Sequence, residues 1–143
     1  MKTIITLIVL AFAFVTTTQA QVEKVLVKSV ALDGNSLAVV NLPGEVSVLE
    51  WDKDYIRVTA TVNVLNFDDN IAKRLVVVGR YELKTETVEG QLVITMPKIS
   101  NLVTIKGTLL QETFSFEVQS PKGYQVIVKT SAQAEEGTIG QNL

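Results

Sequence analysis

Carboxylates are the side chains of this sequence that could do acid–base chemistry, because its 143 residues include no histidine and no cysteine. A Ser-His-Asp triad, a thiolate nucleophile, a disulfide and a metal site built on histidine or cysteine are excluded. Asp52 and Asp54 lie two residues apart, and Asp68 and Asp69 are adjacent. A glycosidase needs two carboxyl groups about 5–10 Å apart, one with a raised pKa, whereas aspartates at turns and helix starts commonly bond the backbone. We expect no catalytic residue, with a carboxylate-only glycan hydrolase as the alternative.

The acidic residues do not match a calcium loop. Asp52 and Asp54 begin as an EF-hand loop does, but Ile56 occupies the third ligand position and no glycine follows at the sixth. We therefore expect no metal site and, without a glycine-rich phosphate loop, no cofactor. The chain has 13 Lys and Arg against 15 Asp and Glu, a net charge of −2. Because nucleic-acid binders need a basic footprint, we expect no nucleic-acid partner.

Trp51 and Tyr55 are the candidate ligand-binding residues, since they flank the acidic turn 52–54. Aromatic side chains at an exposed turn can stack on sugar rings or anchor a protein partner. The other interpretation, which we favour, is that Trp51 plugs the corner of the fold and closes the end of the sheet packing, with one edge of its ring partly exposed. If Trp51 is a plug, Trp51→Ala should lower the free energy of unfolding by about 3–5 kcal/mol. If it is an exposed anchor, the same change should alter the free energy of unfolding by no more than about 0.5 kcal/mol.

The segment 55–65 has the clearest pattern, because apolar and polar residues alternate over five repeats. Such alternation is typical of a half-buried antiparallel strand. The residues that would face the core are Ile56, Val58, Ala60, Val62 and Val64. Thr59 and Thr61 would present their hydroxyls on the opposite, outer face, where exposed threonines are also ordinary strand residues.

Further β patterns fill the rest of the chain, separated by turn residues such as Asp33-Gly34-Asn35, Pro43-Gly44 and the hairpin pair Glu89-Gly90. The predicted strands are 23–31, 37–42, 45–50, 55–65, 81–88, 91–96, 113–119 and 124–129. One short helix is predicted near 68–75, capped by Asp68, with 76–78 returning to β structure. The expected fold is all-β: a single-domain antiparallel sandwich or open β-roll.

The pattern of residues 1–20 predicts a signal peptide. A basic start precedes an apolar run of twelve residues from Ile4 to Val15, and Thr18-Gln19-Ala20 resembles a cleavage site. Twelve residues are too few for a membrane-spanning helix, which needs about 20. We expect a β domain over 21–130, a flexible tail over 131–143, no transmembrane segment after cleavage, and export to the periplasm, the cell surface or the medium.

Several segments resemble a known bacterial family. They are 42–48 (LPGEVSV), 52–58 (DKDYIRV), 90–97 (GQLVITMP), 116–118 (FEV) and 121–123 (PKG). Together they resemble the "putative auto-transporter adhesin head" family of β-rich surface proteins, over residues of about 40–130. The resemblance implies a surface protein with stacked β rungs. It also implies a minimal or shortened head, because the chain stops about twenty residues after the segment 121–123.

These observations lead to one functional expectation and two alternatives. We expect an exported, non-catalytic, adhesin-like interaction module of the cell surface or envelope, with an unknown protein or glycan partner. The alternatives are the carboxylate-only glycan hydrolase and a structural subunit of an envelope assembly.

Overall fold

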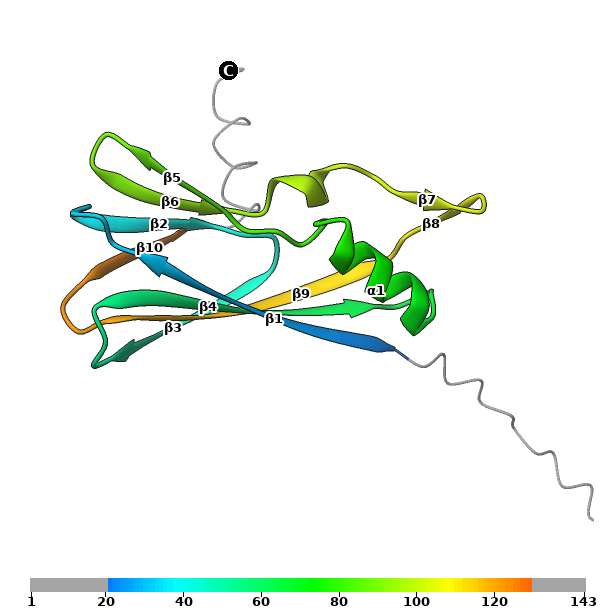
Figure 1. Ribbon diagram of the computed structural model, residues 1–143, viewed down its shortest axis with the longest axis horizontal. Coiled ribbons are helices and arrows are strands. Elements are labelled where there is room, and N and C mark those ends of the chain that lie inside the picture. The colour runs from blue at the N-terminus through cyan, green and yellow to red at the C-terminus, as the bar shows by residue number, and fades with distance from the viewer. Residues whose placement is uncertain (1–20, 130–143) are drawn as a thin grey trace, which may run out of the picture.

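A computed structural model of the chain describes residues 21–129, so the predicted signal peptide (1–20) and tail (131–143) lie outside the described residues. Two four-stranded sheets form the two layers of the fold, with a short helix at one end (Figure 1). The expected all-β fold with one short helix is confirmed. The strands are β1 (Val22–Ala31), β2 (Leu37–Asn41), β3 (Glu45–Trp51), β4 (Tyr55–Val64), β5 (Lys84–Val88), β6 (Gln91–Thr95), β7 (Thr104–Ile105), β8 (Thr108–Leu109), β9 (Glu112–Pro121) and β10 (Gln125–Lys129). The helices are α1 (Asp69–Val77) and the 3-10 turn η1 (Pro97–Ser100).

The two sheets are built from strands that are distant in the sequence. Sheet A has the order β1-β4-β9-β3, in which β4 runs antiparallel to β1 and β9, and β3 runs parallel to β9. Sheet B has the order β10-β2-β6-β5, in which β2 runs parallel to both β10 and β6, and β5 runs antiparallel to β6. A third, two-stranded sheet is the hairpin β7-β8.

The parallel pairs differ from the antiparallel sandwich that the alternation suggested, and two crossing connections explain them. Residues 42–44 carry the chain from β2 in sheet B to β3 in sheet A, and residues 122–124 carry it from β9 in sheet A to β10 in sheet B. Each connection and its two strands form an arch. Because the two arches stack, β10 lies parallel to β2 while β3 lies parallel to β9.

The core lies between the inner faces of sheets A and B. Strand β4 alternates between partly buried and buried residues along its whole length, and the five predicted core residues are each at most 1% exposed. Ala38 and Val40 of β2, Ile94 of β6, and Phe116 and Val118 of β9 complete the centre of the core. The period-two pattern therefore assigned the inner face correctly, since each of these strands has one face turned to the opposite sheet.

Helix α1 begins and ends with defined caps. Asp68 is the N-cap, as predicted, and its Oδ1 accepts a hydrogen bond from the Ile71 N–H at 3.0 Å. The predicted return to β structure at 76–78 is wrong, because the helix continues to Val77 and the Val78 N–H donates to the Arg74 carbonyl. Burial of Ala72 and Leu75 on one side of α1 outweighs the β preference of the valines.

Asp69 ties the first turn of α1 to β1. Its two carboxylate oxygens contact Lys24 Nζ at 2.5 Å and Lys73 Nζ at 2.7 Å. These two ammonium groups hold the pKa of the Asp69 carboxyl below its ordinary value. The helix is thereby anchored on the edge strand of sheet A.

Two further segments differ from the predicted strands. Residues 81–83 are not part of β5, because this segment folds inward to bury Tyr81 and Leu83. The hairpin β7-β8 was missed. Its turn residues Lys106 and Gly107 both have positive φ, as do Glu89 and Gly90 of the predicted hairpin, so the pair Lys106-Gly107 was the available signal.

Candidate functional site: the outer face of sheet A

The outer face of sheet A carries a continuous set of polar and aromatic side chains. Strand alternation turns the residues between the core positions of β4, β9 and β3 outward, and the register aligns them across the sheet. Arg57 lies opposite Gln119, and Thr59 opposite Glu117, which in turn lies opposite Ser47. The outward set is Tyr55, Arg57, Thr59, Thr61, Ser115, Glu117, Gln119, Glu45, Ser47, Leu49 and Trp51.

Trp51, Tyr55 and Arg57 form an aromatic cluster at one end of this face. The rings of Trp51 and Tyr55 meet edge to face, with centroids 4.9 Å apart, and the Trp51 indole N–H donates to the Tyr55 carbonyl at 2.8 Å. The Arg57 guanidinium lies 4.8 Å from the centroid of the Trp51 ring, and its Nε donates to Gln119 Oε1 at 2.8 Å. These contacts fix the orientation of the indole.

The structure brings both predicted site residues together, in a position that neither interpretation anticipated in full. Trp51 is partly buried, as a plug would be, but it does not belong to the core cluster of the described residues. Its ring packs on the outer face of sheet A, against Tyr55 and Arg57, instead of closing the space between the sheets. Trp51 and Tyr55 are therefore held in place while remaining accessible to a ligand.

A shallow groove of about 310 Å³ lies next to the aromatic cluster on the same face. Hydroxyl and carboxylate side chains from β3, β4 and β9 line it: Glu45, Ser47, Thr59, Thr61, Ser115 and Glu117. Ser47 Oγ donates to the Phe116 carbonyl at 3.5 Å. The predicted outward threonines thus form one wall of a hydroxyl-rich depression. Its carboxylates come from two neighbouring strands.

The aspartate pairs are not brought together. Asp52 and Asp54 lie in the turn between β3 and β4, whereas Asp68 and Asp69 lie at the start of α1, beyond the other end of the ten-residue strand β4. Among residues 21–129, no three acidic side chains are placed to hold a metal ion. Also within this range, no helix has the length and apolar character needed to cross a bilayer.

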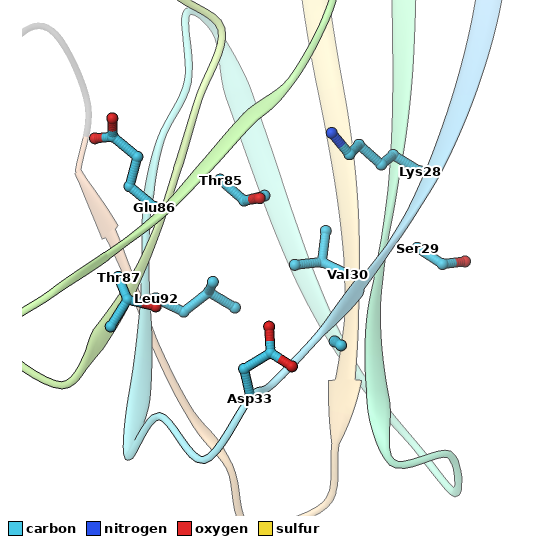
Figure 2. A pocket seen from close by; sticks show the side chains of 9 residues that line it. Lys28, Ser29, Val30, Asp33, Thr85, Glu86, Thr87 and Leu92 are labelled. Carbon is cyan, nitrogen blue, oxygen red and sulfur yellow. The ribbon is translucent and has the colours of Figure 1, made fainter.

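A second, smaller cavity of about 200 Å³ lies between the edge strands β1 and β5 (Figure 2). Lys28 and Asp33 point into the opening, whereas Glu86 points away from it. Lys28 Nζ already donates to the Leu83 carbonyl at 2.8 Å, and Glu86 is paired with Lys84. Because Lys28 and Glu86 are engaged with the protein itself and no aromatic side chain lines the cavity, it is a weaker candidate than the outer face of sheet A.

One buried polar cluster was missed from the sequence. Arg80 Nε and Glu112 Oε1 are 2.8 Å apart, with side chains only 10% and 4% exposed. Tyr81 Oη and Glu112 Oε2 are buried and make no hydrogen bond within the described part of the chain. Burial first, and the Glu112 charge second, raise the pKa of Tyr81 above its ordinary value. The cluster faces the interior, so we assign it to stability and not to ligand binding.

Arg57, Gln119 and the residues of the groove were also absent from the predicted site. The outward phase of 113–119 follows from the same alternation that identified Phe116 and Val118 as inward. The register that sets Gln119 beside Arg57 and Glu117 beside Thr59 carries no local sequence signal. Alternation could have supplied the outward residues, but not their neighbours.

Comparisons with known proteins identify no family. No family model and no curated protein sequence matches this chain. Among solved structures, the chain is similar to a "putative cell adhesion protein" from Clostridium sporogenes ATCC 15579, with 12% identity, a TM-score of 0.39, and coverage of 76% of this chain and 46% of that one. It is also similar to a "putative adhesin" from Parabacteroides merdae ATCC 43184, with 15% identity, a TM-score of 0.31, and coverage of 75% and 35%. The match spans less than half the length of either protein.

Proposed function

We propose that this chain is an exported, non-catalytic interaction module that binds a glycan on the outer face of sheet A. One observation carries the proposal: the aromatic cluster of Trp51, Tyr55 and Arg57 and the hydroxyl-lined groove share this face. Either feature alone is ordinary for a β protein. Their adjacency provides an amphipathic surface next to a row of polar groups.

Sugar chemistry fits this combination. A pyranose ring has an apolar C–H face that packs on aromatic rings, and its edge carries hydroxyl groups that need hydrogen-bond partners. The groove offers hydroxyls from Ser47, Thr59 and Thr61, which can both donate and accept, and carboxylates from Glu45 and Glu117, which accept. The open face suits a chain polymer, because it does not require the end of the polymer to enter a closed cavity.

The absence of catalysis is part of the proposal. Glu45 and Glu117 are diagonal neighbours on one face of the parallel pair β3–β9, and this proximity alone does not distinguish a binding site from a glycosidase. A glycosidase also needs one carboxyl in surroundings that raise its pKa. Both side chains are solvent-exposed. A retaining or inverting hydrolase is the alternative, and release of reducing ends from any polysaccharide by the protein, with loss of release in Glu117→Gln, would establish it.

A binding experiment tests the glycan proposal. The protein starting at Gln21 is passed over a panel of immobilised neutral, acidic and amino polysaccharides, and affinities are measured for the parent and for Trp51→Ala and Thr61→Val. We expect retention on at least one polysaccharide and a loss of about tenfold or more in each variant, which corresponds to about 1.4 kcal/mol.

The matched control is Thr95→Val, since Thr95 is a partly buried threonine of β6 that lies outside sheet A. This variant should bind like the parent. If no polysaccharide retains the parent, or if the two sheet A variants bind as tightly as the control, the outer face of sheet A is not a glycan site.

Export is tested separately. Expression of the full chain in a bacterium with a functioning secretion system, followed by intact-mass measurement of the released protein, should give a chain that begins at Gln21. A protein that retains Met1 contradicts export.

A further inference from the structure

Within residues 21–129, each of the two sheets ends in strands that pair on one side only, and the charges on these edge strands differ between the two sides of the sandwich. Among the described residues, β1 and β3 are the edges of sheet A, and β5 and β10 are the edges of sheet B. Lys28 of β1 reaches the Leu83 carbonyl, just before β5. The edges β1 and β5 therefore lie on one side of the sandwich, and β3 and β10 lie together on the other.

The β1–β5 side is protected against pairing with another strand. Lys24 and Lys28 occupy inward positions of β1 and are held there by Asp69 and the Leu83 carbonyl. Inward-pointing charges on an edge strand oppose edge-to-edge association. The short strand β5 presents the ion pair between Lys84 and Glu86. A partner strand at either edge would have to displace these charged groups or desolvate them.

The β3–β10 side leaves apolar residues in water. Val48 faces the core, opposite Val118, yet is 40% exposed because no strand follows β3 among the described residues. Its neighbour Leu49 is 50% exposed, and Ile127 at the centre of β10 is 37% exposed. Val48 has the core phase, whereas Leu49 points outward from sheet A and Ile127 outward from sheet B.

Val25 and Val27 of β1 are exposed to a similar extent, so exposure alone does not distinguish the two sides. The difference is that β3 and β10 have no lysine at an inward position, and the one charge at an inward position, Glu50, lies near the end of β3.

The sequence of β3 is complementary to itself about Val48. In an antiparallel pair of two β3 strands centred on this residue, Val48 meets Val48, Ser47 meets Leu49, and Val46 meets Glu50. At the ends of the pair, Glu45 meets Trp51. No like charges lie directly opposite each other, so the pairing avoids the repulsion that destabilises cross-strand neighbours.

Strand β10 can also pair antiparallel with its own copy without placing like charges opposite each other, and its central residue lies as far along the sandwich as Val48 of β3. Centred on Ile127, an antiparallel pair places Gln125 opposite Lys129. Val48 lies beside Val118, three residues before β9 ends, and Ile127 lies three residues after Tyr124 at the end of the 122–124 turn. Both residues are thus about 10 Å from that turn, so one two-fold axis can pass close to both.

From this geometry we propose that two copies of the chain associate through β3 and β10 about a single two-fold axis perpendicular to the sheets. Sheets A and B of one copy continue into those of the other, and the exposed edges of this side disappear. Such an interface is isologous and closes at the dimer. The proposal does not depend on glycan binding. The dimer would nevertheless affect glycan binding, because the outer faces of sheet A of the two copies would lie on the same side of the dimer. Both grooves would then lie next to the two-fold axis.

The first test is the mass in solution of the protein starting at Gln21, by sedimentation velocity at concentrations up to about 0.1 mM, which detects dimers with dissociation constants below that value. We expect a dimer. Val48→Lys places two ammonium groups opposite each other at the axis and should give a monomer with an unchanged β-type circular dichroism spectrum. Val25→Lys is the matched control, because Val25 is an exposed valine on β1, the other edge of sheet A, and should leave the dimer intact.

The second test uses the absence of cysteine from the chain. Opposite residues of an antiparallel pair have Cα atoms about 4.5–5.5 Å apart, within the range that a disulfide bridges. Val48→Cys should therefore be oxidised to a covalent dimer much faster than Val25→Cys in dilute solution. This test remains informative if Val48→Lys fails to fold.

Three results would overturn the proposal. A monomeric parent up to the highest concentration would exclude the dimer. An open series of larger species would indicate head-to-tail association. Equal rates of cross-linking for Val48→Cys and Val25→Cys would exclude Val48 from the axis.

Discussion

The buried ion pair between Arg80 and Glu112 offers the largest single effect on stability. Arg80→Met leaves the Glu112 carboxylate, which is 4% exposed, without its cation. Removing one partner of a buried pair costs about 3–5 kcal/mol, since the remaining charge stays desolvated. Arg80 Nη1 also donates to the Lys98 and Asn101 carbonyls at 3.3 and 3.0 Å. These bonds lie on exposed residues where water can replace them, so the expected loss stays at about 3–5 kcal/mol.

The assay is urea unfolding followed by circular dichroism, with the free energy of unfolding extrapolated to water. Lys98→Met is the matched control, because Lys98 pairs with Glu82 at 3.3 Å and both side chains are at least half exposed. An exposed pair of this kind contributes at most about 1 kcal/mol. The double variant Arg80→Met with Glu112→Met should be more stable than Arg80→Met alone, since apolar replacement removes the buried charge.

The reasoning would be refuted if Arg80→Met unfolded within about 1 kcal/mol of the parent. That result would mean that the Glu112 carboxylate reaches water in the variant. A double variant that is less stable than Arg80→Met would show that Glu112 stabilises the fold through contacts other than its ion pair with Arg80.

Three further predictions concern single residues. The raised pKa of Tyr81 keeps its proton in the folded chain, while the unfolded chain loses it above about pH 10. The free energy of unfolding is therefore unaffected by Tyr81 below that pH and falls above it. An alkaline series of urea titrations should show a steeper fall in the parent than in Tyr81→Phe, in which Tyr124, whose pKa burial also raises, is still present. Gly44→Ala should cost more than Gly34→Ala in the same assay, because an added Cβ at Gly44 would lie 2.4 Å from the Phe114 carbonyl oxygen and nothing lies within 4 Å at Gly34. Trp51→Ala should lower the free energy of unfolding by about 1–2 kcal/mol, the sum of one hydrogen bond and one cation–π contact. A loss of about 3–5 kcal/mol would instead support the interpretation of Trp51 as a corner plug.

Local pattern predicted those elements whose determinants lie within a few residues of one another. The alternation along 55–65 assigned the inner face of β4, the Asp68 carboxylate capped α1, and Glu89-Gly90 formed the turn between β5 and β6. Pro97 ended the ladder after β6, since proline cannot donate to a neighbouring strand.

The pairing of strands could not be predicted in the same way. Strands 37–41 and 125–129 have similar patterns, and neither specifies that the two lie parallel and adjacent. The parallel order arises from the two crossing connections, whose geometry depends on packing between the sheets. Charged residues normally lie in solvent, so no local pattern marks Arg80 and Glu112 as buried, and their burial depends on a contact between positions 32 residues apart.

The candidate site was predicted in part for the same reason. Trp51 and Tyr55 are four residues apart, so the turn between them was enough to bring them together. The Arg57–Gln119 bond and the wall of the groove formed by β9 depend on the register of β4 and β9, which a single sequence does not reveal. Sites assembled across strands require the sheet order before they can be recognised.

The stacked arches have a consequence for the time course of folding. Leu37 of β2 pairs with Gln125 of β10, 88 positions later, and Glu45 of β3 pairs with Ser115 of β9. Topologies dominated by such distant pairings fold slowly, in milliseconds to seconds, because loop closure precedes the stabilising contacts. The pair β1–β4 and the set β2-β6-β5 need neither β9 nor β10, but sheet A is completed only when β9 joins β4 to β3, and sheet B only when β10 is added. The core between the two sheets is therefore completed only when the last strands of the chain have been made.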